Sequence, residues 1–426
     1  MNTGQERINE FVIREKQGRL GMKSEWTKKK LSDIADFNPR EIIKKGAIAK
    51  KIPMDVLRPF YRDIPYSVEA CFSGGMKFRN GDTIMARITP CLENGKTAQV
   101  SILNDGEVGF GSTEYIVFRA KEGIADKDYL YYLVCSPEVR ELAIKSMVGS
   151  SGRQRVQTDV VKNLEIDVPP LVEQEKIGSL LKLFDDKIAL NDKINKNLEQ
   201  QAQTIFKSWF VDFEPFGGVQ PSEMQFIPLQ ELCKVVTKGT TPTTLGKSFT
   251  NSGINFIKAE SIHDNHSIDS SKFAFIDEET NALLKRSIIK ANDIVFTIAG
   301  TLGRFAMIDN SMLPANTNQA VAIIRPDETK VTPAYLYSFF IGNWHNEYYS
   351  KRIQQAVQAN LSLTTIKSLP IAVLNDTTMS NYDKLVSPLF ALMKNNEEEN
   401  RRLSKLRDTL LPKLMSGELD VSDIDF

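Results

Sequence analysis

Few residues of this chain have the types and the spacing that enzyme chemistry needs. The stretch 241–248 resembles a phosphate-binding loop, but Thr241 replaces its first glycine and Pro242 interrupts it. Such a loop needs glycine amides close to the phosphates, so nucleotide binding is not expected. His263 and His266 lie three residues apart without a third or fourth ligand in view, so they do not indicate a metal site.

The histidines and glycines do not indicate an active site either. All three histidines lie in the second half of the chain, whereas an active site built on the duplicated fold would need a copy in the first half. The glycines at 109 and 111 lack the strand and the further glycine of a dinucleotide-binding turn. We therefore expect no catalytic residue, no metal site and no cofactor bound by this chain.

Polar and basic side chains that suit DNA recognition gather in loops of both halves. Arg, Lys, Asn and Gln can hydrogen-bond base edges, and Ser and Thr beside glycine suit contacts with phosphate. A single loop residue of this kind is more often an ordinary solvated side chain, so the clusters carry the interpretation. The candidate DNA-binding residues are Arg87, Lys96, Thr113, Ser151, Arg153, Gln154 and Arg155 in the first half, and Thr240, Thr241, Arg304, Asn318, Gln319, Gln358 and Asn360 in the second.

Two long helices are expected to position these loops. Apolar or small residues recur over 177–205 at alternating steps of three and four if Asn191 and Asn195 count as members, which predicts a helix with one narrow seam. The pattern returns near the end of the chain, and antiparallel pairing places Asn191 opposite Glu399 and Asn195 opposite Asn396. In one interpretation these polar pairs fix the register of the two helices. In the other, the middle of the seam is polar because a partner subunit docks there. The expected seam residues are Ile177, Leu181, Phe184, Ile188, Asn191, Leu198, Leu392, Glu399, Leu403, Leu406 and Leu410.

The chain is interpreted as a duplicated unit in the order globule, helix, globule, helix. Residues 292–297 match 81–86, and 335–337 match 129–131. The predicted fold class is α+β, with two mixed α/β domains joined by two long helices that pair as an antiparallel coiled coil. The expected boundaries are a leader at 1–22, a first domain at 23–170, a central helix at 171–215, a second domain at 216–378, a distal helix at 379–418 and a tail at 419–426.

The composition sets limits on the class of protein. With 426 residues the chain is long enough for two or more domains, and its 41% hydrophobic content is ordinary for a globular protein. No apolar run is long enough to span a membrane, the N-terminus does not read as a signal peptide, and four unclustered cysteines suggest a cytoplasmic protein. A formal net charge of zero counts modestly against a simple basic DNA binder, but does not exclude a basic surface.

The order of these segments resembles the specificity subunits of type I restriction–modification systems. Each short stretch is weak evidence alone, whereas their order, their duplication and the two helices together are specific. The resemblance covers about residues 24–420. It is carried by GDTIMARITP at 81–90, ENGK at 93–96, LEIDVPPLVEQ at 164–174, KGTTP at 238–242, NDIVFT at 292–297, GTLGR at 300–304 and LLPKLMSGEL at 410–419.

The resemblance implies a non-catalytic subunit that recognises a bipartite sequence in double-stranded DNA. Each globule, then a target-recognition domain, would read one half-site, and the helices would set the spacer and dock two modification subunits. Those partners would carry S-adenosylmethionine and methylate adenine, while restriction subunits would use ATP and Mg²⁺. The competing interpretation is a non-catalytic coiled-coil scaffold with two protein-binding modules.

Overall fold

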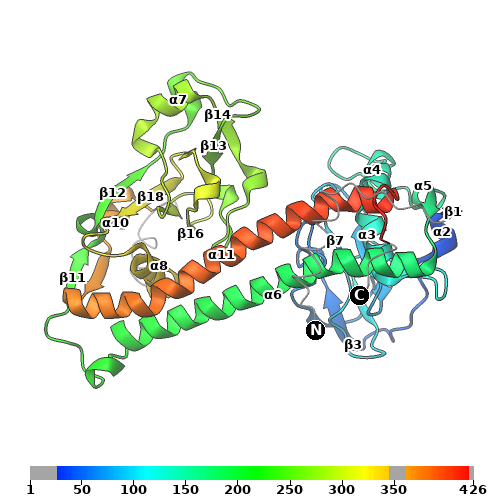
Figure 1. The fold of residues 1–426 in the computed structure, drawn as a ribbon, viewed down its shortest axis with the longest axis horizontal. Coiled ribbons are helices and arrows are strands. Elements are labelled where there is room, and N and C mark those ends of the chain that lie inside the picture. Colours follow the sequence, from blue (N-terminus) through cyan, green and yellow to red (C-terminus); the bar gives the residue numbers. More distant parts are fainter. Residues whose placement is uncertain (1–25, 345–360, 422–426) are drawn as a thin grey trace. The chain divides into compact units, whose positions relative to one another are not determined.

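The computed structural model describes residues 26–344 and 361–421, and the chain divides into two compact units (Figure 1). Unit 1 comprises residues 1–192 and 397–426, and unit 2 comprises 193–396. Helix α6 (Leu171–Phe210) and helix α11 (Asp376–Met415) each give part of their length to both units. The compact units therefore differ from the order globule, helix, globule, helix along the sequence, because each long helix is divided between them. No helix in the described part of the chain is long and apolar enough to cross a membrane.

Unit 1 contains two four-stranded sheets and a two-stranded ribbon. The first sheet is antiparallel, in the order β2-β9-β6-β7. In the second sheet, ordered β4-β3-β8-β5, strands β3 and β8 run parallel. The elements are β1 (Thr27–Lys30), α2 (Leu31–Ile34), β2 (Ala35–Phe37), β3 (Ile48–Ile52), β4 (Val68–Cys71), β5 (Lys77–Phe78), β6 (Thr83–Ala86), β7 (Thr97–Gln99), β8 (Gly109–Gly111), β9 (Tyr115–Ala120), α3 (Lys127–Cys135), α4 (Pro137–Lys145), α5 (Thr158–Lys162) and β10 (Glu165–Val168).

Unit 2 repeats this plan in its own residues. Its antiparallel sheet has the order β12-β18-β15-β16, its second sheet has the order β14-β13-β17 with β13 and β17 parallel, and β11 pairs with β19 as β1 pairs with β10. The elements are β11 (Gln225–Pro228), β12 (Cys233–Lys238), β13 (Ile254–Ile257), β14 (Ala274–Ile276), α7 (Glu278–Leu283), β15 (Ile294–Thr297), β16 (Phe305–Met307), β17 (Ala315–Thr317), β18 (Val321–Pro326), α8 (Pro333–Ile341), α10 (Leu363–Lys367) and β19 (Pro370–Val373). The duplication expected from the sequence is therefore present in the fold.

The central strand of each antiparallel sheet begins at the same kind of corner. Gly81 and Asn292 adopt positive φ of 90° and 65°, which glycine and asparagine tolerate best. The aspartate that follows each is buried and receives two hydrogen bonds of 2.7 Å from one arginine, Asp82 from Arg119 and Asp293 from Arg325. The repeated Gly-Asp and Asn-Asp pairs of the sequence thus mark a structural corner.

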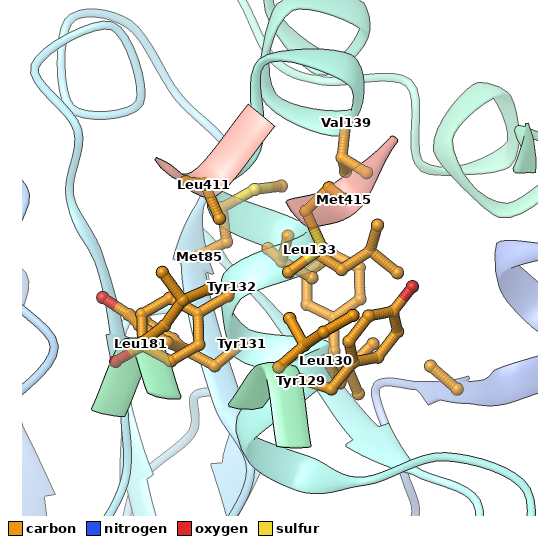
Figure 2. Close-up of a cluster of buried hydrophobic side chains, with 14 of the residues drawn as sticks. Met85, Tyr129, Leu130, Tyr131, Tyr132, Leu133, Val139, Leu181, Leu411 and Met415 are labelled. Carbon is orange, nitrogen blue, oxygen red and sulfur yellow. The ribbon is translucent and has the colours of Figure 1, made fainter. Parts of the chain in front are cut away.

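The core of unit 1 is built around α3, which is buried on every side over Tyr129–Val134. Its start is fixed because the Asp126 carboxylate accepts the amides of Asp128 and Tyr129 at 2.9 and 2.8 Å. Figure 2 shows how Met85, Leu181, Leu411 and Met415 surround this helix. The two long helices are thus part of the hydrophobic core of unit 1.

Within unit 1, the helix pair has a mixed apolar and polar seam. Ile177, Leu181, Phe184, Ile188, Leu403 and Leu410 are buried in one cluster, with Leu406 partly buried beside it. Asn191 is fully buried and donates to Glu399 at 2.8 Å and to Asn400 at 2.9 Å. A buried ion pair joins Arg407 to Asp185, which also accepts the Tyr132 hydroxyl at 2.6 Å. The contact between Asn191 and Glu399 is the one expected from antiparallel pairing.

Within unit 2, part of the expected seam is present and part is replaced by other residues. Leu198 is buried, and Asn396 donates to Asn195 at 2.7 Å, as the register requires. Leu392, however, is 45% exposed and does not belong to the seam. Tyr382 and Val386 are fully buried instead, because this part of α11 turns them toward the core of the second domain.

The ends of the long helices differ from the expected positions by a few residues. Helix α6 ends at Phe210 instead of continuing to 215, because Phe213 adopts positive φ and Pro215 follows. Helix α11 begins at Asp376 instead of 379, because the Asn375 side chain accepts the Thr378 amide at 2.9 Å. It ends at Met415 instead of 418, because Gly417 adopts positive φ and closes the helix.

Candidate nucleic-acid interface

In unit 1, three loop segments meet where strand β6 ends. Arg155 forms β-bridges with Ile88 and Val148. Thr89 donates its amide to the Gln154 carbonyl and accepts the Gln154 amide on its hydroxyl, both at 3.0 Å. The segment 87–89, the turn after β8 and the polar loop 148–157 are therefore one structured surface and not separate flexible loops. This surface contains most candidate DNA-binding residues of the first half.

Arg155 is the most firmly oriented cation of this surface. The Glu114 carboxylate accepts its Nε–H at 3.0 Å and its Nη2–H at 2.8 Å, and the Arg153 carbonyl accepts its Nη1–H at 3.4 Å. These hydrogen bonds from the guanidinium to Glu114 raise the pKa of Arg155, so the arginine stays charged. The pair remains reachable, since the Arg155 side chain is 44% exposed. Glu114 was not among the residues predicted from the sequence.

Other candidates of the first half divide into exposed and internally bonded side chains. Thr113, Ser151 and Arg153 are exposed. Lys96 instead donates to the Met54 carbonyl at 2.9 Å, and Arg87 donates to the Val156 carbonyl at 3.4 Å. Lys96 and Arg87 thus link neighbouring loops through hydrogen bonds to backbone carbonyls.

In unit 2, Arg304 takes the place of Lys96. Lys96 directly precedes β7, and Arg304 directly precedes β16, the edge strand at the same position in the other antiparallel sheet. Each side chain donates to a backbone carbonyl in the segment that follows β3 or β13. For Arg304 this acceptor is Ile262, at 3.3 Å. Its guanidinium also forms a two-point pair with Asp264 at 2.7 and 2.9 Å. Arg304 therefore anchors this loop within unit 2, and its contact with DNA stays a prediction.

The other polar cluster of unit 2 lies around Thr240, Thr241 and Gln319. The Thr241 hydroxyl donates to Gln319, and Arg286 donates to the Thr240 hydroxyl at 3.3 Å. These loops approach closely because residue 239 is glycine. A side chain there would put its Cβ 1.9 Å from the Thr317 carbonyl oxygen. Asn318 uses its side chain to accept the Ala320 amide at 3.1 Å. Arg286 belongs to this cluster although no sequence motif marks it.

Two predicted residues, Gln358 and Asn360, lie outside the described part of the chain. The neighbouring Leu361 donates its amide to the Ile298 carbonyl at 2.9 Å, next to the end of β15. In unit 1, Val156 likewise donates to the Arg87 carbonyl at 2.8 Å, next to the end of β6. The residue two positions before α5 or α10, Val156 or Leu361, is thus attached at matching places in the two units.

One loop of unit 2 carries a partly buried histidine. His266 adopts positive φ, stacks on Phe305 with ring centroids 4.0 Å apart, and has Nε2 3.9 Å from Glu199 of α6. Burial lowers the pKa of His266, and the Phe305 backbone and Asp264 only partly oppose this shift. His266 is therefore held by packing against Phe305. Among residues 26–344 and 361–421, no group of three or more His, Cys, Asp or Glu is arranged to hold a metal ion.

Comparison with known proteins identifies relatives of this architecture. The family model described as the type I restriction modification DNA specificity domain matches residues 23–200 and 221–376. The chain is similar to the type I restriction enzyme MjaIX specificity subunit of Methanocaldococcus jannaschii, with 28% identity over 71% of each chain. It is also similar to the HindI specificity subunit of Haemophilus influenzae, with 25% identity over 80% of this chain and 87% of that one. A crystal structure of a type I restriction–modification S subunit from M. genitalium shares the fold, with a TM-score of 0.55, 15% identity and coverage of 93% and 97%.

Proposed function

Because the chain belongs to the family of type I restriction–modification DNA specificity subunits, we propose that units 1 and 2 each read one half of a bipartite DNA target through the loop surfaces described above. Members of this family are the non-catalytic, target-recognising subunits of their complexes. The two target-recognition domains would read different half-sites, because their loop side chains differ more than their arrangement of strands and helices.

The observation that carries this proposal is that the two units share one arrangement of strands but have different polar side chains in their loops. Both units repeat the buried Asp–Arg corner and the parallel strand pair, and in both a backbone amide, of Val156 or Leu361, donates to a carbonyl just after the end of the central strand. Unit 1 places Arg153 and Arg155 on that surface, whereas unit 2 places Thr240, Thr241 and Gln319 nearby. Arginine, threonine and glutamine differ in the base edges they contact, so different half-sites are expected.

The partners and cofactors of the complex extend the proposal. We propose that the long helices set the spacer between the half-sites and dock two modification subunits, which carry S-adenosylmethionine, and that restriction subunits with ATP and Mg²⁺ join them. This chain itself would bind no cofactor. A cytoplasmic location is consistent with its four free cysteines.

A selection from randomised duplex DNA with the full chain and its modification subunit tests the proposal. Two short conserved blocks separated by a spacer of fixed length and free sequence are expected. Affinity for the selected site should fall steeply as salt rises, because phosphate contacts release counterions. A chain without sequence preference and without salt dependence would support the scaffold with two protein-binding modules instead.

A further inference from the structure

We propose that Glu114 is a specificity-determining positioning residue, which directs Arg155 to a guanine edge instead of to DNA phosphate. The inference rests on the proposed function of unit 1 and adds a residue that touches no base itself. It follows from the geometry of one ion pair and from the charge that this pair leaves on the surface.

The geometry fixes the arginine before DNA arrives. Both backbone hydrogen-bonding groups of Arg155 pair with Val148, its N–H at 2.9 Å and its carbonyl at 3.0 Å. Glu114 then holds the edge of the guanidinium that carries Nε and Nη2. Nη1 gives one of its two hydrogens to the Arg153 carbonyl and Nη2 gives one to Glu114, so each nitrogen keeps one further N–H donor on a side chain that is 44% exposed. Two adjacent donors in one plane match the O6 and N7 acceptors of guanine in the major groove.

The charge balance argues against phosphate as the target. The carboxylate neutralises the arginine locally, so the pair has little long-range attraction for a phosphate backbone. A hydrogen-bonding edge survives this neutralisation, whereas a free guanidinium would bind any phosphate it meets. The remaining donors of Arg155 therefore favour the uncharged O6 and N7 acceptors of guanine, which carry sequence information that a phosphate does not.

The chain offers a matched control for this carboxylate. Glu107 is also in unit 1, is as exposed as Glu114 at 25%, and pairs with a cation, Lys50, at 3.0 Å. It lies before β8, whereas Glu114 follows that strand. Glu107→Gln therefore removes the same charge from the same unit without touching Arg155.

The experiment uses the full chain with its modification subunit, and measures binding to the selected site, to the site with each base pair replaced, and to random duplex DNA. For Glu114→Gln we expect tighter binding to random DNA, a salt slope steeper by about 0.9, and a tenfold or greater loss of discrimination at one guanine. Arg155→Lys should lose discrimination at the same base pair. The double variant should lose no more than either single one, because the two residues act as a unit.

Different outcomes separate the possible failures. If Glu114→Gln and Glu107→Gln raise affinity for random DNA alike and neither changes base preference, Glu114 contributes only charge and the inference is overturned. Loss of discrimination at many base pairs together with a lower melting temperature would mean a purely structural role, and would also overturn it. If the unaltered chain prefers no bipartite site, the proposed function fails, and the inference fails with it.

Discussion

At the scale of residues, the Asp–Arg pairs explain why a short motif recurs in both halves. Asp293 is fully buried and accepts two arginine hydrogen bonds as well as the Lys290 amide at 2.8 Å. Arg325 also reaches the Ile288 carbonyl at 3.0 Å, so the pair ties the start of β15 to β18 and the preceding loop. A buried ion pair whose hydrogen bonds are all formed favours one arrangement of the segments that it joins. Removing one partner leaves the other as a buried charge without a counterion.

Asp293→Asn is therefore expected to destabilise unit 2 by about 3 kcal/mol, because Arg325 keeps its charge without a counterion. Urea unfolding followed by tryptophan fluorescence and circular dichroism measures the loss. Asp264→Asn provides the control, since Asp264 is 81% exposed and its pair with Arg304 should contribute less than about 1 kcal/mol. Equal losses in the two variants would contradict this account of the corner.

His266 makes the stability of unit 2 depend on pH. Since burial lowers its pKa in the folded protein below the ordinary value of 6.5, the unfolded chain binds the proton first as pH falls. At pH above about 6.5 both states are neutral and this group has no effect. Below it, the free energy of unfolding falls with the pH until the pH reaches the pKa of the folded state.

We expect the difference in melting temperature between pH 7.5 and pH 5.5 to be smaller in His266→Phe than in the unaltered chain. Phenylalanine keeps the ring stacked on Phe305 but cannot take a proton. Differential scanning calorimetry at the two pH values measures the effect. An unchanged difference would show that other groups, such as the neighbouring Glu199, dominate the acid dependence.

At the scale of elements, the long helices show that a heptad pattern alone does not select the buried face. Leu392 and Leu403 both fit the predicted repeat, yet Leu392 is 45% exposed and Leu403 is fully buried. Over the unit 2 half of α11, Tyr382 and Val386 face the core because aromatic side chains of α8 and α6 pack there. The domain core, and not the helix partner, decides which stripe is buried.

Leu403→Ala should accordingly cost about 3 kcal/mol, whereas Leu392→Ala should change the free energy of unfolding by less than about 0.5 kcal/mol. The two substitutions remove the same atoms from one helix, so only burial differs. Chemical denaturation of the full chain measures both. Similar costs would mean that Leu392 is covered in the folded protein.

At the scale of the whole molecule, the chain passes from one compact unit to the other within each long helix, next to polar residues. Unit 1 ends at Asp192 and resumes at Glu397, and on either side of these points Asn191 and Asn195 hydrogen-bond to α11 within their own units. Such buried polar pairs favour one register over its alternatives. The stretch is therefore the natural place to lengthen both helices without moving either seam out of phase.

Inserting one heptad after Asp192 and one after Asn396 should add about 10 Å to the helix pair, from roughly 1.5 Å per residue. This corresponds to about three base pairs of duplex at roughly 3.4 Å per step. If the helices set the spacer, the preferred spacer grows by about this amount, and both half-sites stay the same. Selection from randomised DNA would reveal it, and an unchanged spacer would rule out the helices as the determinant.

The sequence by itself determined the duplication, the fold class and the polar pairs of the helices. These follow from order and periodicity along the chain, and local chemistry is enough to fix them. Asn191 and Asn195 interrupt an apolar repeat at fixed steps, so their partners Glu399 and Asn396 follow from antiparallel pairing alone.

Only the tertiary structure decided what each polar loop residue does. Lys96 and Arg304 have the chemistry of DNA contacts, and the fold also lets Lys96 donate to the Met54 carbonyl and Arg304 to the Ile262 carbonyl and the Asp264 carboxylate. Arg155 gains its orientation from Glu114, which is 41 residues distant in the chain. The number of donors that a side chain has left for DNA depends on which acceptors the fold brings within about 3 Å. Residue type and spacing along the sequence do not show these distances.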